Sequence, residues 1–499
     1  MILSKSDYML FLRHPAWLWL KKFDKYKLPP IDENTQAIFD AGNEFEDYAE
    51  KLYPDAVRLG FSNYDEYLAM PHETKTALDK GASTIFQGRF EADGITCIVD
   101  VLNRVEGNTF DLIEIKSSTR AKPEHGYDLA FQTIVLEKSG IKIRNIAIIH
   151  VNKEYVRNGG IEHKKITSKT DVTASVKVLI DTTKEQINKA FAVLSQKTMP
   201  NLSPRYVNQI GVSSTRWFEE WLEIYKSLNQ SLDLYNICFL SYPNAQQIGQ
   251  LEDNGINKIG DMPKKLALRP KQLVQIQTTR DNKKIIDKEK IREFLDTFKY
   301  PLYFLDYETF SSVIPKFDGC QPYKDYPFQY SLHIFDSPEA ELRHEEYLHQ
   351  ENSNPMPQLI EKLKADIGSR GTILTWNMSY EKGCNDRMAG FYSEHKKFLE
   401  SLNQRINDLM IPFSEMWFVD KNFFGSASVK KVMPVLVPEL SYKKLNVSDG
   451  LSARRIWTQT ILEGKNHDQK EKILLDLSKY CTLDTYAMVR ILGKLQTIG

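Results

Sequence analysis

Two stretches of alternating apolar and polar residues mark the first third of the chain. They cover residues 94–102 and 109–117, and Glu106-Gly107-Asn108 lies between them. Alternation with a period of two is typical of β-strands, and a glycine among polar residues is typical of the turn that joins them. The pattern therefore predicts a β-hairpin, which the helical segments around it place in an α/β module.

The pattern changes twice further along the chain. Between residues 176 and 194 the apolar positions follow helical spacing, and short helical segments continue to residue 295. A continuous apolar run at residues 302–305 then indicates a buried strand of a second α/β module. We expect an α/β multidomain protein with an N-terminal α/β domain over residues 1–170, a helical connector over 171–295 and a C-terminal α/β domain over 296–499.

One segment of the connector suggests contact with a phosphate group. Residues 251–262 resemble a helix-hairpin-helix, in which a turn at Gly255 presents backbone amides between two helices. A plain helical linker is the other interpretation of this segment.

Length and composition agree with a modular globular protein. The chain has 499 residues, which is more than one ordinary core holds, and 41% of them are hydrophobic. Its 66 basic and 66 acidic residues cancel, so contact with nucleic acid would need local patches of charge. The five scattered cysteines form no disulfide or zinc pattern, and no apolar stretch has the length of a signal peptide or membrane span. We expect a cytoplasmic protein.

Three charged residues of the predicted hairpin form the first candidate site. Glu114 and Lys116 are two residues apart on one strand and therefore share a face, while the isoleucines beside them face the other way. Asp100 lies among β-branched residues of the partner strand, where a buried acid is costly without a partner such as a metal ion. This set suits hydrolysis of phosphodiester bonds, since carboxylates hold Mg²⁺ or Mn²⁺ and a lysine orients water or stabilises developing charge.

Further motifs surround these three residues. In chain order the whole set is Leu3-Ser4-Lys5-Ser6-Asp7, Pro15-Ala16-Trp17-Leu18-Trp19-Leu20, Gly42-Asn43-Glu44-Phe45-Glu46, Asp100, Glu114-Ile115-Lys116-Ser117 and Gln132. It resembles the RecB-like PD-(D/E)XK nucleases, a family that includes the nucleases of CRISPR adaptation. The resemblance implies a restriction-endonuclease-like fold, with Glu46 as a helical acid near the metal and Gln132 as a helical glutamine that supports the site and binds nucleic acid.

Two positions depart from that family. His14 stands where many relatives carry a cysteine that binds an iron–sulfur cluster, and no companion cysteines exist, so we expect no such cluster. Leu136 stands where the family has tyrosine, which affects the substrate-binding end of the motif more than the metal site. The alternatives are an exposed Glu–Lys pair or a degenerate scaffold that only binds nucleic acid.

A second set of acids begins where the apolar run ends. Asp306 and Glu308 share one face of that strand, and an acid pair there needs a cation or a base to neutralise it. Downstream, a short strand leads into Asn377-Met378-Ser379-Tyr380-Glu381. Tyr480 and Asp484, four residues apart, share one face of a helix near the C-terminus. Taken singly, these features also fit a strand-end acid, a loop amide and a capping pair.

In this order and spacing the second set resembles the tyrosine-type DEDD exonucleases, which have an RNase H-like fold. The resemblance implies that two Mg²⁺ or Mn²⁺ ions are held by Asp306, Glu308, Glu381 and Asp484, and that Tyr480 orients the attacking water.

Other residues of this region are weaker candidates. Glu381 stands where the family has aspartate, so Asp408 is an alternative acid, and Asn377 is a candidate contact for nucleic acid. Lys430 and Lys431 follow a Gly/Ser turn and could clamp a phosphate, although a solvated lysine pair fits equally. The last 200 residues also resemble a bacterial family catalogued mainly as a domain of unknown function, which occurs as a C-terminal partner of RecB-like nuclease domains.

The sequence therefore predicts a nuclease with two sites, dependent on Mg²⁺ or Mn²⁺. We expect its substrate to be nucleic acid, DNA rather than RNA, as single strands or ends, with no membrane contact. The alternatives are a nucleic-acid-binding scaffold with one degenerate site and a defence or CRISPR-associated factor that acts only with partners.

Overall fold

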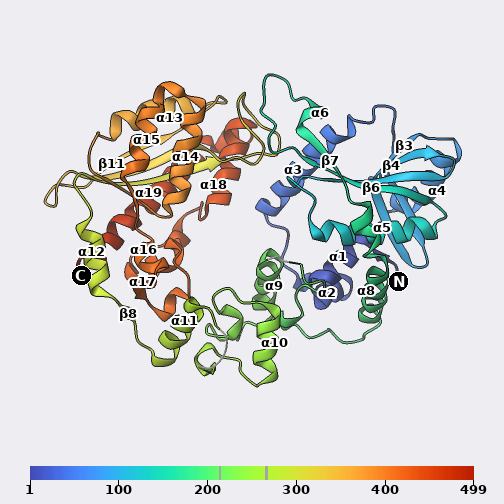
Figure 1. The fold of residues 1–499 in the computed structure, drawn as a ribbon, viewed down its shortest axis with the longest axis horizontal. Coiled ribbons are helices and arrows are strands. Elements are labelled where there is room, and N and C mark those ends of the chain that lie inside the picture. Colours follow the sequence, from blue (N-terminus) through green and yellow to red (C-terminus); the bar gives the residue numbers. More distant parts are fainter. Residues whose placement is uncertain (213–214, 264–267, 499) are drawn as a thin grey trace. The chain divides into compact units, whose positions relative to one another are not determined.

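The chain divides into two compact units in the computed structural model, which describes residues 1–212, 215–263 and 268–498 (Figure 1). Unit 1 comprises Met1–Leu232, Asn244–Gln250 and Val313–Pro322. Unit 2 comprises Asp233–Pro243, Leu251–Ser312 and Tyr323–Gly499. Within the described residues, no helix combines the length and the apolar character that crossing a membrane requires.

A mixed sheet of seven strands forms the centre of unit 1 within the residues described. Its strands are β1 (Leu3–Ser4), β2 (Val57–Arg58), β3 (Thr84–Ala92), β4 (Ile95–Glu106), β5 (Thr109–Lys116), β6 (Lys142–Val151) and β7 (Thr167–Asp171). They follow the order β2-β3-β4-β5-β6-β7, and β1 pairs with β4. β4 is antiparallel to both of its neighbours, β3 and β5, whereas β6 runs parallel to β5.

The hairpin expected from the alternating pattern is present as β4 and β5. Val101 pairs with Ile113, and the turn contains Gly107 with a positive φ of 48°. That conformation suits glycine because it has no Cβ. The alternation therefore sends Ile113 and Ile115 to one side of the sheet and Glu114 to the other.

Helices cover both faces of this sheet. The helices of unit 1 are α1 (Lys5–Arg13), α2 (Pro15–Phe23), α3 (Glu33–Glu50), α4 (Tyr64–Asp79), α5 (Pro123–Lys138), α6 (His163–Ile166), α7 (Thr173–Lys177), α8 (Ile180–Leu194) and α9 (Thr215–Leu228). Residues of α1, α5 and α8 share one apolar core with β4 and β5, and residues of α3 share a second core with the opposite face. Glu114 faces α5, where the polar partners described below lie.

A segment from the second half of the chain completes the α3 core. Val313 and Ile314 are 4% and 3% exposed and pack with Phe45 and Ile115. The Arg157 side chain donates hydrogen bonds to the carbonyl oxygens of Pro315 and Lys316, 2.9 and 2.6 Å away. Unit 1 is therefore discontinuous in sequence.

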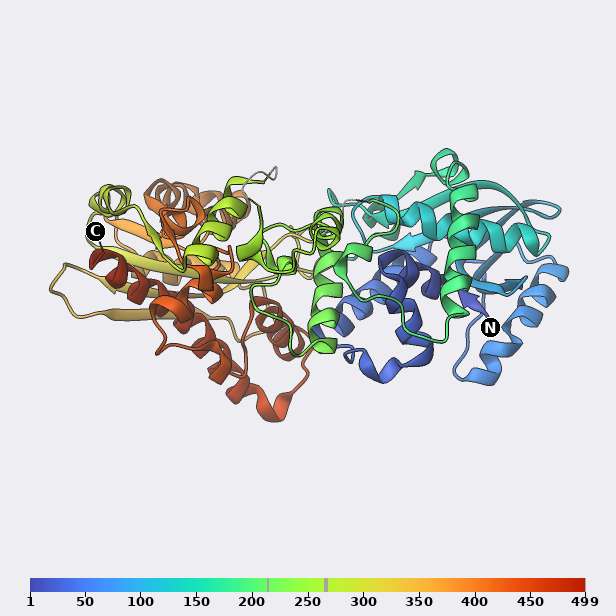
Figure 2. The same ribbon diagram turned by 90° about the horizontal axis from the view of Figure 1, so that it is seen from below.

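A five-stranded sheet forms the centre of the described part of unit 2. Its strands are β9 (Leu302–Phe310), β10 (Tyr326–Phe335), β11 (Arg343–Leu348), β12 (Thr372–Thr375) and β13 (Ile406–Asp408), in the order β11-β10-β9-β12-β13. The first three strands are antiparallel, and β12 runs parallel to both β9 and β13. The turn between β10 and β11 extends past the helices that cover the sheet (Figure 2). The buried strand expected at residues 302–305 is the start of β9.

The two faces of this sheet carry different helices. They are α13 (Met356–Asp366), α14 (Met378–Phe391) and α15 (Lys396–Arg405) on one face and α19 (Lys470–Gln496) on the other (Figure 1). Along β9, Tyr307 donates a hydrogen bond to Asn385 of α14, while Asp306 lies beside Cys481 of α19. Asp306 and Glu308 therefore both face α19.

The residues expected to form a connector are shared between the units. Unit 1 takes α8 and α9, and unit 2 takes α11 (Pro270–Asp281) and α12 (Lys288–Asp296). A short strand, β8 (Ile285–Ile286), pairs with β14 (Phe418–Val419). The segment 251–262 holds the end of α10 (Ala245–Asp253), a turn at Gly255 and a 3-10 turn at Ile259–Asp261. Residues 264–267, which follow it, lie outside the described residues.

Three short helices complete unit 2. They are α16 (Ile411–Ser414), α17 (Val429–Leu436) and α18 (Gly450–Trp457). Residues of α17 and α18 reach the acids on β9 and α19, as the next subsection describes.

Candidate active sites

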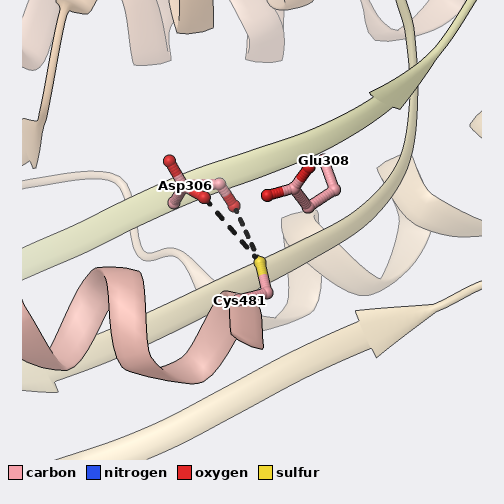
Figure 3. A group of neighbouring side chains, drawn as sticks. All are labelled: Asp306, Glu308 and Cys481. Atoms are coloured by element: carbon pink, nitrogen blue, oxygen red, sulfur yellow. Dashed lines mark hydrogen bonds between the residues drawn. The ribbon is translucent and has the colours of Figure 1, made fainter. Parts of the chain in front are cut away.

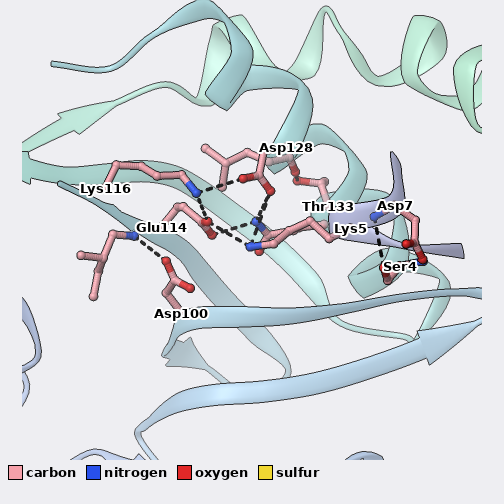
Figure 4. Close-up of polar contacts among 11 residues, drawn as sticks. Ser4, Lys5, Asp7, Asp100, Glu114, Lys116, Asp128 and Thr133 are labelled. Atoms are coloured by element: carbon pink, nitrogen blue, oxygen red, sulfur yellow. Dashed lines mark hydrogen bonds and ion pairs between the residues drawn. The ribbon is translucent and has the colours of Figure 1, made fainter. Parts of the chain in front are cut away.

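The three residues expected to form the first site do lie together on β4 and β5. Lys116 Nζ is 2.6 Å from Glu114 Oε1 and 3.0 Å from Asp128 Oδ2 of α5 (Figure 4). Asp100 Oδ2 accepts a hydrogen bond of 2.8 Å from the backbone amide of Ile115. The alternation on β5 and the packing of α5 thus bring Glu114, Lys116 and Asp128 to one point.

Lys5 is a second lysine of this cluster that the sequence argument did not single out. Its Nζ lies 3.0 Å from Glu114 Oε1 and 3.6 Å from Asp128 Oδ1. Burial alone would lower the pKa of Lys5, but Asp128 and Glu114 raise it well above its ordinary value. Lys5 begins α1, whose first turn is fixed by a capping box between Ser4 and Asp7. The capping box can be read from the motif at residues 3–7, but the contacts of Lys5 with Glu114 and Asp128 cannot.

Gln132 lies where the resemblance implies, against the acids. Its Nε2 donates to Glu114 Oε2 at 2.8 Å and to Asp128 Oδ1 at 2.9 Å. Burial would raise the pKa of Asp128, yet Lys116 and Lys5 hold it well below its usual range. Leu136, one turn further along α5, is fully buried in the apolar core. The acids Glu114 and Asp128 are therefore already partnered by two lysines and an amide.

Asp100 and Glu46 are the acids with fewer partners. Burial and then Glu114 raise the pKa of Asp100 above its ordinary value. Burial also raises the pKa of Glu46, which accepts a hydrogen bond from Gln87 Nε2. Gln87 interrupts β3 with a positive φ of 56°, a conformation uncommon outside glycine. Asp100 interacts electrostatically with Glu114 and Glu46. Among the described residues, however, these three acids do not bring their ligand atoms as close together as Asp306, Glu308 and Cys481 do in unit 2.

The second set of acids converges in unit 2. Ligand atoms of Asp306, Glu308 and Cys481 all lie within 4.8 Å of one another (Figure 3). Cys481 Sγ is 3.8 Å from Asp306 Oδ2. Burial raises the pKa of the Cys481 thiol well above its ordinary value. Cys481 had no motif to mark it, although it stands next to Tyr480.

Asp484 joins this set from the same helix. It is held by Tyr442, whose hydroxyl donates a hydrogen bond to Asp484 Oδ1. Burial raises the pKa of Asp484, and Tyr442 opposes that rise. Tyr480 is 4% exposed, its ring centre is 6.1 Å from that of Tyr442, and burial and Asp484 raise its pKa. Tyr442 is a residue that sequence spacing alone could not connect to Asp484, because 42 positions separate them.

Glu381 completes the set from the first turn of α14. Its side chain is 1% exposed, and its Oε2 has no hydrogen-bond partner among the described residues. Burial and then Asp306 raise the pKa of Glu381 well above its ordinary value. A buried carboxylate oxygen without a donor is uncommon in a folded protein and points to a missing positive partner.

Asp408, the alternative acid, has a different role in the structure. Its oxygens accept hydrogen bonds from the backbone amides of Asn377, Met378 and Met410 at 3.0, 3.1 and 2.9 Å. Asp408 thus satisfies amides at the start of α14, which helps to position Glu381 in the first turn of that helix. Asn377 is exposed in a left-handed conformation with φ 81°. Asp408 is thus engaged by backbone amides, whereas Glu381 Oε2 has no hydrogen-bond partner among the described residues, so Glu381 is the better candidate ligand for a cation.

Among the described residues, Lys430 lies near the acids without forming an ion pair with them. Lys430 Nζ lies 5.7 Å from the ring centres of both Tyr442 and Tyr480 and donates to the carbonyl oxygen of Ser448 at 3.0 Å. Lys430 lowers the pKa of Asp484 against the larger effect of burial. Lys431 instead lies over the ring of Phe424, 5.6 Å from its centre. Only Lys430 of the predicted lysine pair therefore lies beside the acids.

Arg454 of α18 approaches the same acids from the end of β9. It donates hydrogen bonds to the carbonyl oxygen of Thr309 at 3.1 Å and to Asp325 Oδ1 at 2.6 Å. Burial, Asp306 and Asp484 raise the pKa of Glu308, and Arg454 opposes them. The arginine is thus anchored to the strand end and Asp325, and it only partly offsets the charge of Glu308.

The residues present fit a hard divalent cation. Asp306, Glu308, Glu381 and Asp484 are buried or nearly so, and burial followed by mutual repulsion raises the pKa of Asp306 well above its ordinary value. Oxygen ligands in a buried acidic group suit Mg²⁺ or Mn²⁺, and a bound cation would remove the repulsion. The thiol of Cys481 is a softer donor than this chemistry needs.

Comparison with known proteins gives a family of undefined function. The family described as "Domain of unknown function (DUF2779)" matches residues 303–428, which include Asp306, Glu308 and Glu381. The likeness to such a family, expected over the last 200 residues, is confirmed for this stretch. The two nuclease resemblances stay predictions.

Two mycoplasma proteins without a described function are similar to part of the chain. The "Uncharacterized protein MG366 homolog" of Mycoplasma pneumoniae is 25% identical over 231 residues, which cover 42% of this chain and 34% of that protein. The "Uncharacterized protein MG366" of Mycoplasma genitalium is 24% identical over 229 residues, with the same two shares of 42% and 34%. The chain thus spans about a third of the length of these relatives.

The raised pKa values of the unit 2 acids make the stability of the metal-free protein depend on pH. A carboxyl with a raised pKa favours the folded state below its unfolded pKa of about 4, and this contribution is lost as pH rises through the folded pKa. Asp306→Asn should therefore stabilise the metal-free protein increasingly, by roughly 1 to 3 kcal/mol between pH of about 5 and about 8. Urea unfolding in EDTA over this pH range measures the effect.

With saturating Mn²⁺ the sign should reverse, because wild type gains binding energy that Asp306→Asn loses. Glu339→Gln, an exposed acid of unit 2, is the matched control and should follow wild type. A difference between Asp306→Asn and wild type that does not vary with pH would contradict the interpretation of the site.

The hydrogen bond from Tyr442 to Asp484 gives a separate prediction. Tyr442→Phe removes only the hydroxyl that orients the carboxylate, so we expect Mn²⁺ affinity to fall about tenfold. Calorimetric titration with Mn²⁺ measures this directly. Tyr486→Phe, also a tyrosine close to Asp484 on α19 but in contact with Arg490, should leave the affinity unchanged. Equal affinities of Tyr442→Phe and wild type would rule out this role.

Proposed function

We propose that this protein is a metal-dependent nuclease whose principal active site is the carboxylate cluster of unit 2. The observation that carries the proposal is the grouping of the buried acids Asp306, Glu308 and Asp484, where burial and mutual repulsion raise the pKa values of Asp306 and Glu308. Glu381 interacts electrostatically with Asp306 and Glu308, and its Oε2 is buried without a hydrogen-bond partner among the described residues. Four buried acids with raised pKa values are poorly explained by a structural role, because each would be more stable as an amide or a hydrophobe.

The side chains divide the work of phosphodiester hydrolysis between them. Mg²⁺ or Mn²⁺, when bound, supplies Lewis acidity and a nucleophilic water at neutral pH. The four carboxylates would hold the cations, and Tyr442 fixes the orientation of Asp484. The Tyr480 phenol, protonated because its pKa is raised, can orient the attacking water by hydrogen bonding. Lys430 places positive charge beside the cluster, where a phosphate would approach.

The arrangement of the strands supports this proposal. A sheet with three antiparallel strands followed by two parallel ones, in the order β11-β10-β9-β12-β13, is the arrangement of RNase H-like domains. In such domains the acids lie at the central strand, as Asp306 and Glu308 do on β9. Because fold alone does not determine activity, the proposal depends on the acids rather than on the sheet.

Unit 1 is the second proposed nuclease site. Three antiparallel strands, then α5 and the parallel strand β6, agree with a restriction-endonuclease-like core. Glu46, Asp100 and Glu114 are its candidate metal ligands, and Lys116 would orient water or stabilise developing charge. Gln132 would then support Glu114.

One observation favours a different function for unit 1. Lys5 and Lys116 both pair with Glu114 and Asp128, so this cluster is neutralised without a metal ion. A nucleic-acid-binding scaffold with a degenerate site is therefore the second candidate. DNA as substrate, and a role in defence or with CRISPR-associated partners, rest on family resemblance.

Cleavage assays with end-labelled substrates separate the two sites. The substrates are 3′- and 5′-labelled single- and double-stranded DNA and RNA with Mn²⁺, because label position reveals polarity. Asp306→Asn should slow stepwise 3′ trimming by at least about 100-fold, because it removes a metal ligand. Lys116→Ala should remove a distinct cleavage only if unit 1 is catalytic.

Matched controls are Glu339→Gln and Lys153→Ala, both exposed, which should cleave like wild type. Trimming that persists in Asp306→Asn would exclude unit 2 as its source. Absence of cleavage by wild type on every substrate with either metal would favour the scaffold or the partner-dependent factor.

A further inference from the structure

Tyr242 of unit 2 is an exposed aromatic residue in an unusual backbone conformation. Its side chain is 60% exposed, and its φ of 50° lies in the left-handed region. A bulky residue rarely adopts that conformation, and residues held in it cluster at functional sites. Little of the ring is buried, so packing of the ring does not explain why the conformation is kept.

Two buried glutamines of α11 hold the backbone that precedes Tyr242. The amide of Ser241 donates to Gln275 Oε1 at 2.7 Å, and Gln272 Nε2 donates to the carbonyl oxygen of Ser241 at 2.8 Å. Both glutamines are 2% exposed. The direction in which Tyr242 leaves the surface is thus fixed before any ligand binds.

Two cations lie over the ring of Tyr242. Arg269 Cζ is 5.7 Å and Lys271 Nζ 6.0 Å from the ring centre. Neither forms an ion pair with an acidic residue in the part of the chain that the structure describes. The pair of charges therefore stays available for an anion from outside the protein.

The same combination of an aromatic ring and a cation occurs twice more nearby. Lys431 Nζ lies 5.6 Å from the ring centre of Phe424, and Lys421 Nζ lies 5.2 Å from that of Tyr235. The rings of Tyr235 and Phe424 are themselves 5.8 Å apart. Phe424, like Tyr242, has a left-handed backbone conformation, with φ 52°.

Direct contacts join these pairs into one surface. Ser241 Oγ donates to the carbonyl oxygen of Gly425 at 3.0 Å, which links the residue before Tyr242 to the residue after Phe424. A Cβ at Gly425 would lie 1.9 Å from Ser241 Oγ, so only glycine allows this approach. Lys430, next to Lys431, lies over Tyr480 beside the acids. The surface therefore leads toward the carboxylate cluster.

We infer that this surface, formed by Tyr235, Tyr242, Phe424 and the cations over their rings, binds single-stranded nucleic acid. Unpaired bases can stack on the exposed ring of Tyr242 and against the half-buried rings of Tyr235 and Phe424 whatever their sequence. The lysines and Arg269 contact the phosphates. A duplex keeps its base faces stacked inside, and an acidic peptide has no flat rings to match. That the surface guides a strand into the carboxylate cluster rests on the function proposed above, although binding itself does not.

Fluorescence anisotropy of the full-length protein in EDTA tests binding without cleavage. The probe is a fluorescein-labelled oligothymidylate of about 20 nucleotides, and Tyr242→Ala should raise its Kd about tenfold. Arg269→Ala/Lys271→Ala should raise it similarly and lessen its dependence on salt. Tyr242→Phe keeps the ring and should bind like wild type, as should the control Tyr26→Ala, whose side chain is fully exposed.

Two results would overturn the inference. One is an unchanged Kd for Tyr242→Ala. The other is binding of a duplex or of polyglutamate as tight as that of the oligothymidylate and equally sensitive to Tyr242→Ala.

A small substrate separates this inference from the proposed function. Wild type and Tyr242→Ala should hydrolyse the p-nitrophenyl ester of thymidine 5′-phosphate equally with Mn²⁺, because a single nucleotide has no further bases that could stack on the rings. Asp306→Asn should lose this hydrolysis yet bind the oligothymidylate in EDTA. If wild type hydrolyses nothing while Tyr242→Ala still weakens binding, the nuclease proposal fails but the binding surface is supported. If hydrolysis occurs and Tyr242→Ala does not affect binding, the nuclease proposal is supported and the inferred binding surface is wrong.

Discussion

Repulsion among buried carboxylates is the constraint that the surroundings of the acids in unit 2 must accommodate. Asp306 and Glu308 of β9 lie beside α19, which carries Asp484, and Glu381 at the start of α14 interacts electrostatically with both β9 acids. Burial and this repulsion raise the pKa of Glu308 well above its ordinary value. Like charges out of water are strongly unfavourable unless a cation or a proton compensates them. The surrounding structure holds the acids in place. Asp408 accepts a hydrogen bond from the backbone at the start of α14, and the Tyr442 hydroxyl donates one to Asp484. Such support is expected where a bound metal ion, rather than a side chain of the protein, compensates the charge of the acids.

Unit 1 meets a similar constraint by a different route. Its acids Glu114 and Asp128 are compensated from within, by Lys5, Lys116 and the amide of Gln132. An internally neutralised cluster needs no metal ion for stability, and a metal ion would have to compete with the lysines. The two units thus differ in how much of their charge is left for an external partner, and this difference is the reason why we propose unit 2 for the principal site.

Local pattern predicted much of this arrangement, and contacts between distant segments did not follow from it. The alternation on β5 correctly placed Glu114 and Lys116 on one face, and the apolar run of β9 placed Asp306 and Glu308 likewise. Tyr442 could not be connected to Asp484, because no spacing rule spans the chain between them. The role of Lys5 could not be predicted for the same reason, since its contact with Glu114 joins the start of α1 to the distant strand β5.

The division into units had a similar limit. The pattern of apolar positions indicated three consecutive parts, but Val313 and Ile314 pack in the core of unit 1 although they follow β9 of unit 2 by a few residues. An apolar pair at that point of the sequence does not reveal which core it enters.

The measurement that tests the central claim most directly is a crystal structure grown with Mn²⁺, with anomalous scattering used to locate the ions. The account predicts Mn²⁺ bound by oxygens of Asp306, Glu308 and Asp484, with the buried Oε2 of Glu381 turned toward the metal. Carboxylates that remain free of metal at saturating Mn²⁺, or Mn²⁺ bound only elsewhere, would contradict it.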